Sequence, residues 1–253
     1  MNKNKLIYFL ILCFSLTWIC FGILVANSHF EIVSNNNFVS NVAKSVGAFM
    51  PTIAIVILLK KYGSVYGRKT IWQFICDFPK KISAYGIILL FMAWRLLVFV
   101  INGDLSQANS LYMLIPVVLI QLFFQGGFEE PGWRGFLQPC FEKKYPFIIS
   151  VVFVSIVWAI WHIPLWFVAN SVQGQMNFLI FFLQILVNSF TLAAILKITK
   201  SVFFCMLYHA WGNAVFLIIP FEMSNGMIVA YTLEAIIALT LSLIYIKKYE
   251  NAV

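Results

Sequence analysis

Residues 111–142 read LYMLIPVVLIQLFFQGGFEEPGWRGFLQPCFE, and this stretch decides what kind of fold the chain can adopt. Its apolar part, 111–128, is close to the roughly 20 residues that a helix needs to cross about 30 Å of hydrocarbon. Two glutamates and an arginine follow at once. One perpendicular helix over the whole stretch would be about 48 Å long, so the segment must tilt, protrude or break. We expect breaks at Pro131, Gly132 and Pro139, because proline lacks the amide proton of a helical residue.

The whole chain has the composition of a membrane protein. It has 253 residues, of which 62% are hydrophobic and 10% are charged, whereas about a quarter of the residues in soluble proteins are charged. Further apolar runs of near-spanning length occur at 6–26, 46–60, 82–101, 147–169, 178–196, 201–219 and 226–246, and the run at 46–60 is the shortest. No internal repeat or long polar linker divides the chain. We therefore predict an all-α polytopic membrane protein with about eight transmembrane helices, forming a single integral-membrane domain over residues 1–253.

Basic residues predict how the chain is oriented. Lys and Arg collect in short cytoplasmic connections, and with the N-terminus inside, fourteen of the seventeen basic residues fall on the cytoplasmic side. These are Lys3, Lys5, Lys60, Lys61, Arg68, Lys69, Lys80, Lys81, Lys143, Lys144, Lys197, Lys200, Lys247 and Lys248. Only Lys44 lies outside, while Arg95 and Arg134 lie within the membrane. Both termini are therefore predicted to be cytoplasmic.

The net charge of +8 comes from basic residues dispersed at helix ends rather than gathered in one patch. This distribution is typical of contact with an anionic inner leaflet and not of nucleic-acid binding. We expect a multi-pass protein of the cell membrane, in contact with the lipid bilayer. The five cysteines are odd in number and have no CxxC spacing, so the sequence indicates neither a disulfide framework nor a zinc ribbon.

Two connections and the first span complete the outline. Residues 27–45, rich in Asn and Ser, are predicted to form an exposed outer loop. Residues 60–81 mix basic and aromatic side chains, which fits either an amphipathic segment along the membrane interface or a charged connector. The apolar core of the first run has about 21 residues and exceeds the ~7–15 of a signal peptide, so we expect a retained anchor.

Polar and ionisable side chains recur on three of the predicted spans. Each ionisable group within the hydrocarbon costs about 2.5–3.5 kcal/mol, which makes it a functional hypothesis by default. The groups are Glu129, Glu130 and Arg134, then His162, then His209 with Asn213. Counted from the cytoplasmic lysines at about 1.5 Å per residue, most of them lie roughly 20–24 Å deep, and His209 lies about 13 Å deep. We therefore expect three helices to bring these groups to one layer.

The spacing of these residues indicates how they pair. Glu130 and Arg134 are four residues apart and share a helical face, where an ion pair lowers the cost of burying either group. Glu129 is rotated about 100° from Glu130 and points elsewhere. His209 and Asn213, also four apart, can direct their hydrogen-bonding groups to one point.

These residue types favour hydrolysis of an amide. His162 is followed by Pro164, so we expect a bend that opens a hydrated space beside the imidazole. A carboxylate beside that imidazole can take a proton from water. A second imidazole together with a carboxamide can stabilise the oxyanion that forms when the water attacks a carbonyl.

Two further polar pairs have a structural interpretation. Arg95 and Glu234, at a similar depth, are expected to form an ion pair between the third and eighth spans. Gln184 and Asn188, four apart on the sixth span, are interpreted as packing contacts between helices, with the lining of a cavity as the alternative.

Three motifs now connect the chain to a known family. EEPGWR at Glu129 to Arg134, WAIWH ending in His162, and HAWGN at His209 to Asn213 occur in this order. The chain resembles the CPBP intramembrane protease family, also called Abi or CAAX-protease-like, whose motifs are EExxxR, an aromatic residue four before a histidine, and HxxxN. Trp158 stands where Phe is frequent in the family, a mild departure that leaves the assignment of the histidine unchanged.

The resemblance implies an endopeptidase with its catalytic motifs within residues 126–219. Carried over residue by residue, Glu129 and His162 would activate water, His209 and Asn213 would form the oxyanion site, and Glu130 and Arg134 would support them. The substrate would be a membrane-associated peptide or protein, because family members trim prenylated C-termini or act in bacteriocin and pheromone maturation and self-immunity. The Lys-, Asn-, Ile- and Phe-rich composition indicates a bacterial source and favours peptide processing or immunity.

Alternatives with other chemistry remain open at this point. Glu129, His162 and His209 could be the ligands of a catalytic zinc, with water as the fourth ligand. We favour a glutamate mechanism without a metal or other cofactor, because HExxH is absent and the resemblance points to it. A membrane immunity protein without catalytic activity is the second alternative. A transporter is disfavoured because no repeated halves are found. The sequence predicts no oligomeric state.

Overall fold

The computed structural model of this chain describes residues 3–30, 37–108 and 111–249. In these residues the regular structure is helical, apart from one isolated bridge between Val65 and Arg68. Seven segments are long and apolar enough to span a membrane: Asn4–Phe30, Ser40–Tyr62, Ile82–Asn102, Leu111–Glu142, Phe147–Phe167, Phe178–Thr199 and Asn225–Tyr249. An eighth apolar helix, Val202–Ile218, is shorter. The prediction of an all-α polytopic membrane protein is confirmed.

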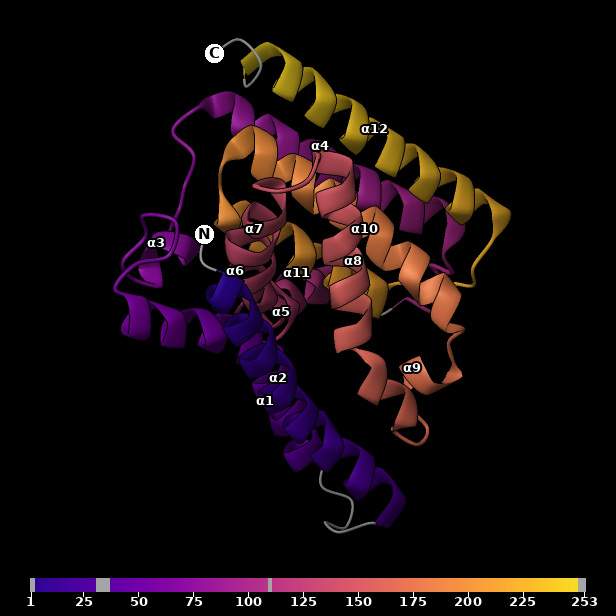
Figure 1. The fold of residues 1–253 in the computed structure, drawn as a ribbon. Coiled ribbons are helices and arrows are strands. Elements are labelled where there is room, and N and C mark those ends of the chain that lie inside the picture. The colour runs from indigo at the N-terminus through magenta and orange to yellow at the C-terminus, as the bar shows by residue number, and fades with distance from the viewer. Residues whose placement is uncertain (1–2, 31–36, 109–110, 250–253) are drawn as a thin grey trace.

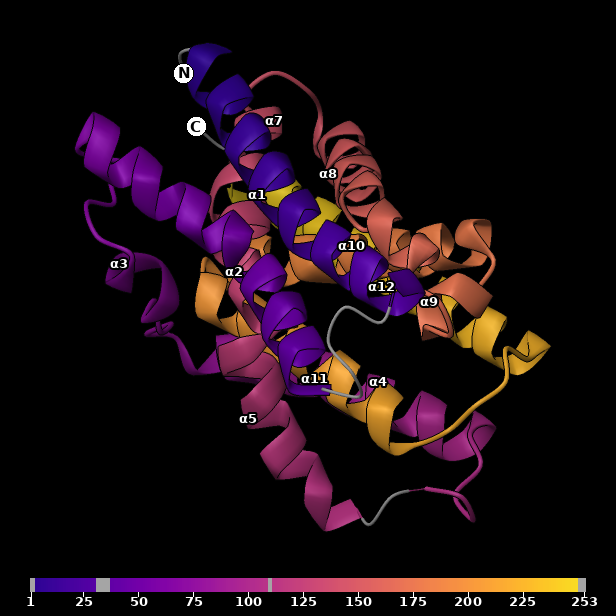
Figure 2. The ribbon, with the colours of Figure 1, turned by 90° about the horizontal axis from the view of Figure 1, so that it is seen from below.

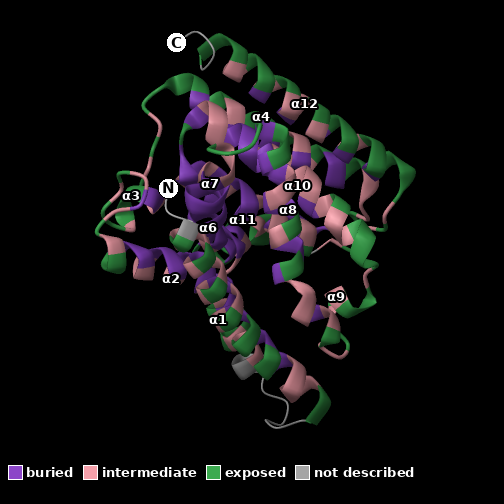
Figure 3. Ribbon diagram, viewed as in Figure 1, coloured by how far each residue is buried: buried purple, intermediate pink, exposed green. Residues whose placement is uncertain are grey.

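The helices pack around one central helix, α11 (Val202–Ile218). The long elements are α1 (Lys3–Phe30), α2 (Asn37–Tyr62), α4 (Ile82–Asn102), α5 (Leu114–Phe124), α8 (Phe147–Trp161), α10 (Phe178–Thr199), α11 (Val202–Ile218) and α12 (Asn225–Tyr249). Helices α1 and α2 pack along each other, and α12 packs across α10 and α4 (Figure 1). Helix α11 contacts α5, α4 and α10 and is buried along much of its length (Figure 3).

Large apolar side chains cover the outside of the bundle. Ile19 on α1, Leu89 on α4, Ile115 on α5, Leu179 on α10 and Leu243 on α12 are all exposed. In water such a surface would be unfavourable, but lipid tails are as apolar as these side chains. The surface is therefore the one expected of a protein surrounded by a bilayer.

The predicted outline was wrong at one outer connection. The expected loop over 27–45 is largely helical, because α1 continues to Phe30 and α2 begins at Asn37, while residues 31–36 lie outside the described part. The second span is consequently not the shortest, and that place falls to α11. Asn and Ser at 27–45 are compatible with helix ends that extend beyond the hydrocarbon, which composition alone did not distinguish from a loop.

The connection after α2 is mostly irregular and contacts the core of the bundle. Residues 63–81 contain only one short helix, α3 (Trp72–Ile75), in which Trp72 is exposed and Phe74 is buried. Arg68 forms an ion pair with Asp77 at 2.7 Å. Phe74 lies against Gly135, where an added Cβ would come within 2.7 Å of its ring, so this connector is anchored to the core.

The fourth span breaks, as predicted, but it breaks at Gln125 and not at Pro131, Gly132 or Pro139. Helix α5 ends at Phe124, and Gln125 has the non-helical angles φ −142° and ψ −126°. A 3₁₀ turn η2 (Gly126–Glu129), helix α6 (Glu130–Gly132), a π-helical turn η3 (Trp133–Leu137) and helix α7 (Gln138–Glu142) follow. Pro131 and Pro139 lie in the first turns of α6 and α7, where the missing amide proton has no helical partner. The break therefore precedes Glu129 instead of following it.

Candidate active site

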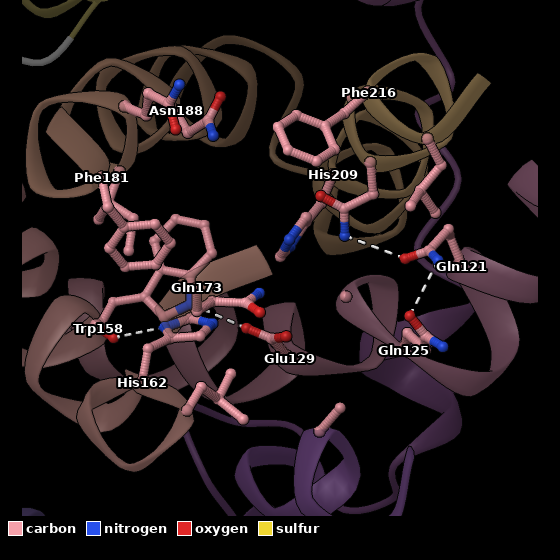
Figure 4. A pocket seen from close by; sticks show the side chains of 18 of the residues that line it. Gln121, Gln125, Glu129, Trp158, His162, Gln173, Phe181, Asn188, His209 and Phe216 are labelled. Carbon is pink, nitrogen blue, oxygen red and sulfur yellow. Dashed lines mark hydrogen bonds between the residues drawn. The ribbon is translucent and has the colours of Figure 1, made fainter. Parts of the chain in front are cut away.

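The residues of the three motifs meet at an internal cavity of about 220 Å³. Glu129, His162, His209 and Asn213 all line it, and they come from η2, the end of α8 and α11 (Figure 4). The cavity has room for several water molecules, which need two to four polar partners each. The predicted convergence of the three spans is thus present in the structure.

The Glu129 carboxylate is held by two tryptophans. Its Oε2 accepts hydrogen bonds from Nε1 of Trp158 at 2.8 Å and Nε1 of Trp133 at 3.2 Å. Indoles are neutral donors, so these bonds orient the carboxylate without an adjacent counter-ion. Its other oxygen, Oε1, is left for the cavity. The side chain is 5% exposed, which restricts its contact with water to that side.

His162 directs one nitrogen to the cavity. Helix α8 ends at Trp161 and is followed by the 3₁₀ turn η4 (Ile163–Phe167), so the bend expected before Pro164 is present. The Nδ1 of His162 donates to the carbonyl of Trp158 at 2.9 Å, because a carbonyl oxygen can only accept. In the neutral ring Nε2 then carries the free lone pair. In the view of Figure 4, the Glu129 carboxylate lies beside the ring of His162 and below the ring of His209.

His209 is oriented by a buried chain of charges. Its Nδ1 lies 2.8 Å from Oε1 of Glu130, and the other oxygen of Glu130 accepts from Nε of Arg134 at 3.1 Å. Arg134 also donates to Ser189 at 3.2 Å and to Gln138 at 3.4 Å. Glu130 and Arg134 are fully buried, as expected for an ion pair at this spacing. An ionised Glu130 only accepts, so His209 carries its proton on Nδ1 and points Nε2 away from Glu130.

Asn213 is oriented by two glutamines of α5 and its C-terminal end. Its Nδ2 donates to Oε1 of Gln121 at 3.1 Å, and Gln121 donates in turn to Gln125 at 2.9 Å (Figure 4). One of the two amide protons of Asn213 remains for a ligand. Asn213 and His209 are thus fixed separately, by different elements, although they share one face of α11.

Gly126 leaves the space between these two donors open. A Cβ at this position would lie 2.5 Å from Nδ2 of Asn213 and 2.6 Å from Nε2 of His209. Both nitrogens therefore lie against the Gly126 backbone, where a side chain at this position would displace them. Sequence reasoning did not single out Gly126, and the only signal was its position just before the EExxxR motif.

Trp158 has a larger part in the site than its motif position suggested. Besides its bond to Glu129, its ring packs edge-on against His209 with centroids 5.1 Å apart. The guanidinium of Arg134 lies 5.5 Å from the centre of the same ring. Trp158 therefore contacts residues of all three motifs. The sequence signal, an aromatic residue four before His162, did not reveal the indole N–H as a donor to Glu129.

Arg95 and Glu234 form the expected ion pair beside the same cavity. The two residues join α4 and α12 through two hydrogen bonds, of 2.7 and 3.2 Å. Asn188 and Tyr208 also accept from Arg95, and Thr191 donates to Glu234 at 2.9 Å. Gln184 and Asn188 both line the cavity, so the alternative interpretation of this pair holds as well as the packing one.

A catalytic zinc would need Glu129, His162 and His209 close enough together to bind one ion. Among residues 3–30, 37–108 and 111–249, no group of three or more His, Cys, Asp or Glu side chains is gathered closely enough to hold a metal ion. Glu129, His162 and His209 line one cavity without forming such a group.

Comparisons with known proteins match the part of the chain that carries this site. Residues 111–215 match the family described as "Type II CAAX prenyl endopeptidase Rce1-like". CAAX prenyl protease 2 of Methanococcus maripaludis is 33% identical over 118 residues, which are 44% of this chain and 42% of that protein. Lysostaphin resistance protein A of Staphylococcus haemolyticus is 25% identical over 108 residues, which are 42% of this chain and 28% of that protein. The matches thus span less than half of either relative.

Fold and site together define a class, a polytopic helical membrane protein with a carboxylate, two imidazoles and a carboxamide around one internal cavity. Within this class, residues 111–215, a stretch that contains all three motifs, match the family of Rce1-like type II CAAX prenyl endopeptidases. The resemblance predicted from the three motifs is confirmed.

Proposed function

We propose that this protein is an intramembrane endopeptidase that hydrolyses a peptide bond with a water activated by Glu129 and His162, without a metal. One observation carries the proposal. The hydrogen bonds that hold Glu129 in the described part of the chain reach Oε2, which leaves Oε1 for the cavity that Glu129, His162, His209 and Asn213 all line. A carboxylate, two imidazoles and a carboxamide around shared space supply a base and oxyanion donors for attack on a carbonyl.

In the proposed first step, Oε1 of Glu129 takes one proton from water, and Nε2 of His162 accepts a hydrogen bond from its other proton. The water oxygen bonds to the carbonyl carbon, and the π electrons move to the carbonyl oxygen. When the tetrahedral intermediate collapses, the carbonyl re-forms, the C–N bond breaks, and Glu129 returns its proton to the leaving amine. The carboxylate is thereby restored for the next cycle.

The oxyanion of the intermediate would lie beside Gly126. There Nδ2 of Asn213 can donate its remaining proton, and protonated His209 can donate from Nε2 while Nδ1 stays bonded to Glu130. Preorganised donors of this kind each contribute about 10²–10³ in rate. Arg134 and Glu130 would act as positioning residues, because they hold His209 and do not face the cavity.

The substrate class we propose is a membrane-associated peptide or protein. The archaeal relative is named for a CAAX prenyl substrate and the staphylococcal relative for resistance to lysostaphin. Processing of a peptide, bacteriocin or pheromone, with a part in self-immunity, follows from the inferred bacterial composition. All of these substrates are polypeptides that reach the site from a membrane surface or from within the bilayer.

The test of this function is Glu129→Gln in the full-length protein in membranes. We expect loss of cleavage with unchanged folding, because Gln still accepts the indole hydrogen bonds but cannot take a proton. Membrane peptides from cells with wild type and with the variant are compared by mass spectrometry. The variants His162→Ala and His209→Ala should behave alike. Equal turnover after replacement of Glu129 would refute the assignment.

Two controls separate this proposal from its alternatives. Glu142→Gln is a matched change on α7, where Glu142 pairs with Lys197 away from the cavity, and it should leave cleavage intact. Activity after chelation, with zinc measured far below the protein concentration, is expected to be full, and its loss would favour zinc. In a protection assay, an immunity protein without catalytic activity would protect equally well with Glu129→Gln.

A further inference from the structure

We propose that the active-site cavity admits its substrate from the extracytoplasmic side of the membrane. This inference rests on the proposed function and on the orientation predicted from the basic residues. It concerns the side from which a polypeptide reaches Glu129, which neither the motifs nor the matched relatives state. The inference follows from where the cavity opens relative to the charged end of the bundle.

The mouth of the cavity is identified by its exposed lining residues. Val172 on α9 (Val172–Gln175) is 59% exposed and Leu217 near the end of α11 is 52% exposed. Lys44 in the first half of α2 is exposed as well. By contrast, Glu129 is 5% and His209 is 9% exposed, and both line the same cavity. The cavity thus leads from these three outer residues inward to the catalytic groups.

Helix direction places this mouth opposite the basic end. Helix α2 ends beside Lys60 and Lys61, so its first half with Lys44 lies at the other end. Helix α10 ends beside Lys200, so α9, which precedes its start, also lies at the other end. Leu217 is at the far end of α11, which begins two residues after Lys200. Three elements therefore agree on the location of the mouth.

The figures show the same separation. Both chain ends and α3 lie on one side of the bundle, and α9 lies on the other, in the views of Figure 1 and Figure 2. None of the fourteen basic residues assigned to the cytoplasmic side lines the cavity. By the positive-inside rule the end that carries them is cytoplasmic, so the mouth is extracytoplasmic.

Toward the basic end the cavity is closed by protein. Trp133, Arg134, Phe136, Leu137 and Gln138 follow Glu129 in the chain, and all are fully buried. Trp161 packs edge-on against Trp133 with ring centroids 5.6 Å apart. Interiors packed in this way leave no passage for a polypeptide. Entry from the cytoplasmic end would require unpacking of the segment that also holds His209.

The mouth carries the one basic residue that departs from the charge bias. Lys44 lines the cavity, and in the described part of the chain it belongs to none of the ion pairs. A basic residue on the outer side of a short connection is unusual. Its position at the mouth gives that opening a positive charge in front of the carboxylate of Glu129.

Cysteine labelling in intact cells tests this inference without requiring activity. Two variants are compared, and both carry Cys20→Ala because Cys20 is half-buried. The first also carries Cys76→Ala and Val172→Cys, which places a thiol at the mouth. The second keeps the natural, exposed Cys76 at the basic end. The probe is a sulfonated maleimide that does not cross membranes. We expect the first variant to be labelled in intact cells and Cys76 to be labelled only after permeabilisation.

The outcomes separate this inference from the proposed function. Labelling of Val172→Cys only after permeabilisation, or of Cys76 in intact cells, would overturn the inference whether or not the protein cleaves peptides. Outside labelling of Val172→Cys that abolishes cleavage of the peptides found in the Glu129→Gln comparison would support it directly. Correct labelling in a protein with no cleavage at all would refute the proposed function alone.

Discussion

Two arginine–glutamate ion pairs are buried in the described part of the chain, and they have similar chemistry but different connections. Arg134 and Glu130 are four residues apart on one segment, and the second oxygen of Glu130 bonds to His209. Arg95 and Glu234 are 139 residues apart and join α4 to α12. The bonds of Glu234 go to Tyr208 and Thr191, neither of which belongs to a motif.

This difference teaches that burial of a charge does not by itself mark a catalytic group. Both pairs are almost fully buried, and Arg95 lines the cavity whereas Glu130 and Arg134 do not. Only the first pair fixes an imidazole that faces the cavity. The second pair links three helices around α11, so we expect it to act on stability, with its effect on cleavage only indirect.

The largest effect is expected from removing one member of either pair. Arg95→Met or Arg134→Met leaves a buried carboxylate unpaired, which costs about 3–5 kcal/mol. Glu130→Gln and Arg134→Ala should likewise reduce the amount of folded protein. Thermal unfolding in detergent and the yield of monodisperse protein measure this loss.

The paired replacements then separate the two networks. Arg95→Met with Glu234→Leu should restore the fold and cleavage, because a buried ion pair can be replaced by apolar residues of similar volume. Arg134→Met with Glu130→Leu should restore the fold but not cleavage, because His209 has lost its acceptor. Full cleavage in the second double variant would show that Glu130 does not position His209.

A smaller effect on stability but a large one on rate is expected from Gly126→Ala. The added methyl group would displace the donor nitrogens of His209 and Asn213, and loss of one such donor costs about 10²–10³ in rate. Gly86→Ala on α4 is the matched control, since nothing lies within 4 Å of its added Cβ. Cleavage rates and melting temperatures of both variants are compared. An unchanged rate in Gly126→Ala would place the oxyanion elsewhere.

The smallest effect is expected from Trp158→Phe. This change keeps an aromatic ring and removes the hydrogen bond to Glu129, so we expect a loss of about tenfold in kcat, equivalent to roughly 1.4 kcal/mol. Trp211→Phe on α11 instead removes a bond to the carbonyl of Met92, away from the residues that line the cavity, and should lower the melting temperature without changing kcat. Equal rates for Trp158→Phe and wild type would show that the Trp133 bond alone holds Glu129.

Particular elements show how far the sequence could predict the structure. The apolar runs were sufficient to predict the spans, and the spacing of Glu130 and Arg134 predicted their ion pair, because both follow from helix geometry. The helical extension of α1 and α2 into 27–45 was missed, since polar residues are found both in loops and in helix ends outside the hydrocarbon. The break lies at Gln125, but the sequence predicted it at Pro131 and Pro139. Proline is found in the first turn of a helix as well as at its end, so its position did not locate the break.

The sequence by itself determined that this chain is a polytopic membrane protein, and that its costly polar groups lie on three spans, because hydropathy and helical spacing are local properties of the chain. Only the tertiary structure decided which atoms meet. The two indoles that hold Glu129, the closeness of Gly126 to His209 and Asn213, and the side on which the cavity opens depend on how distant helices pack. Such contacts join residues far apart in the chain, and no local pattern specifies them.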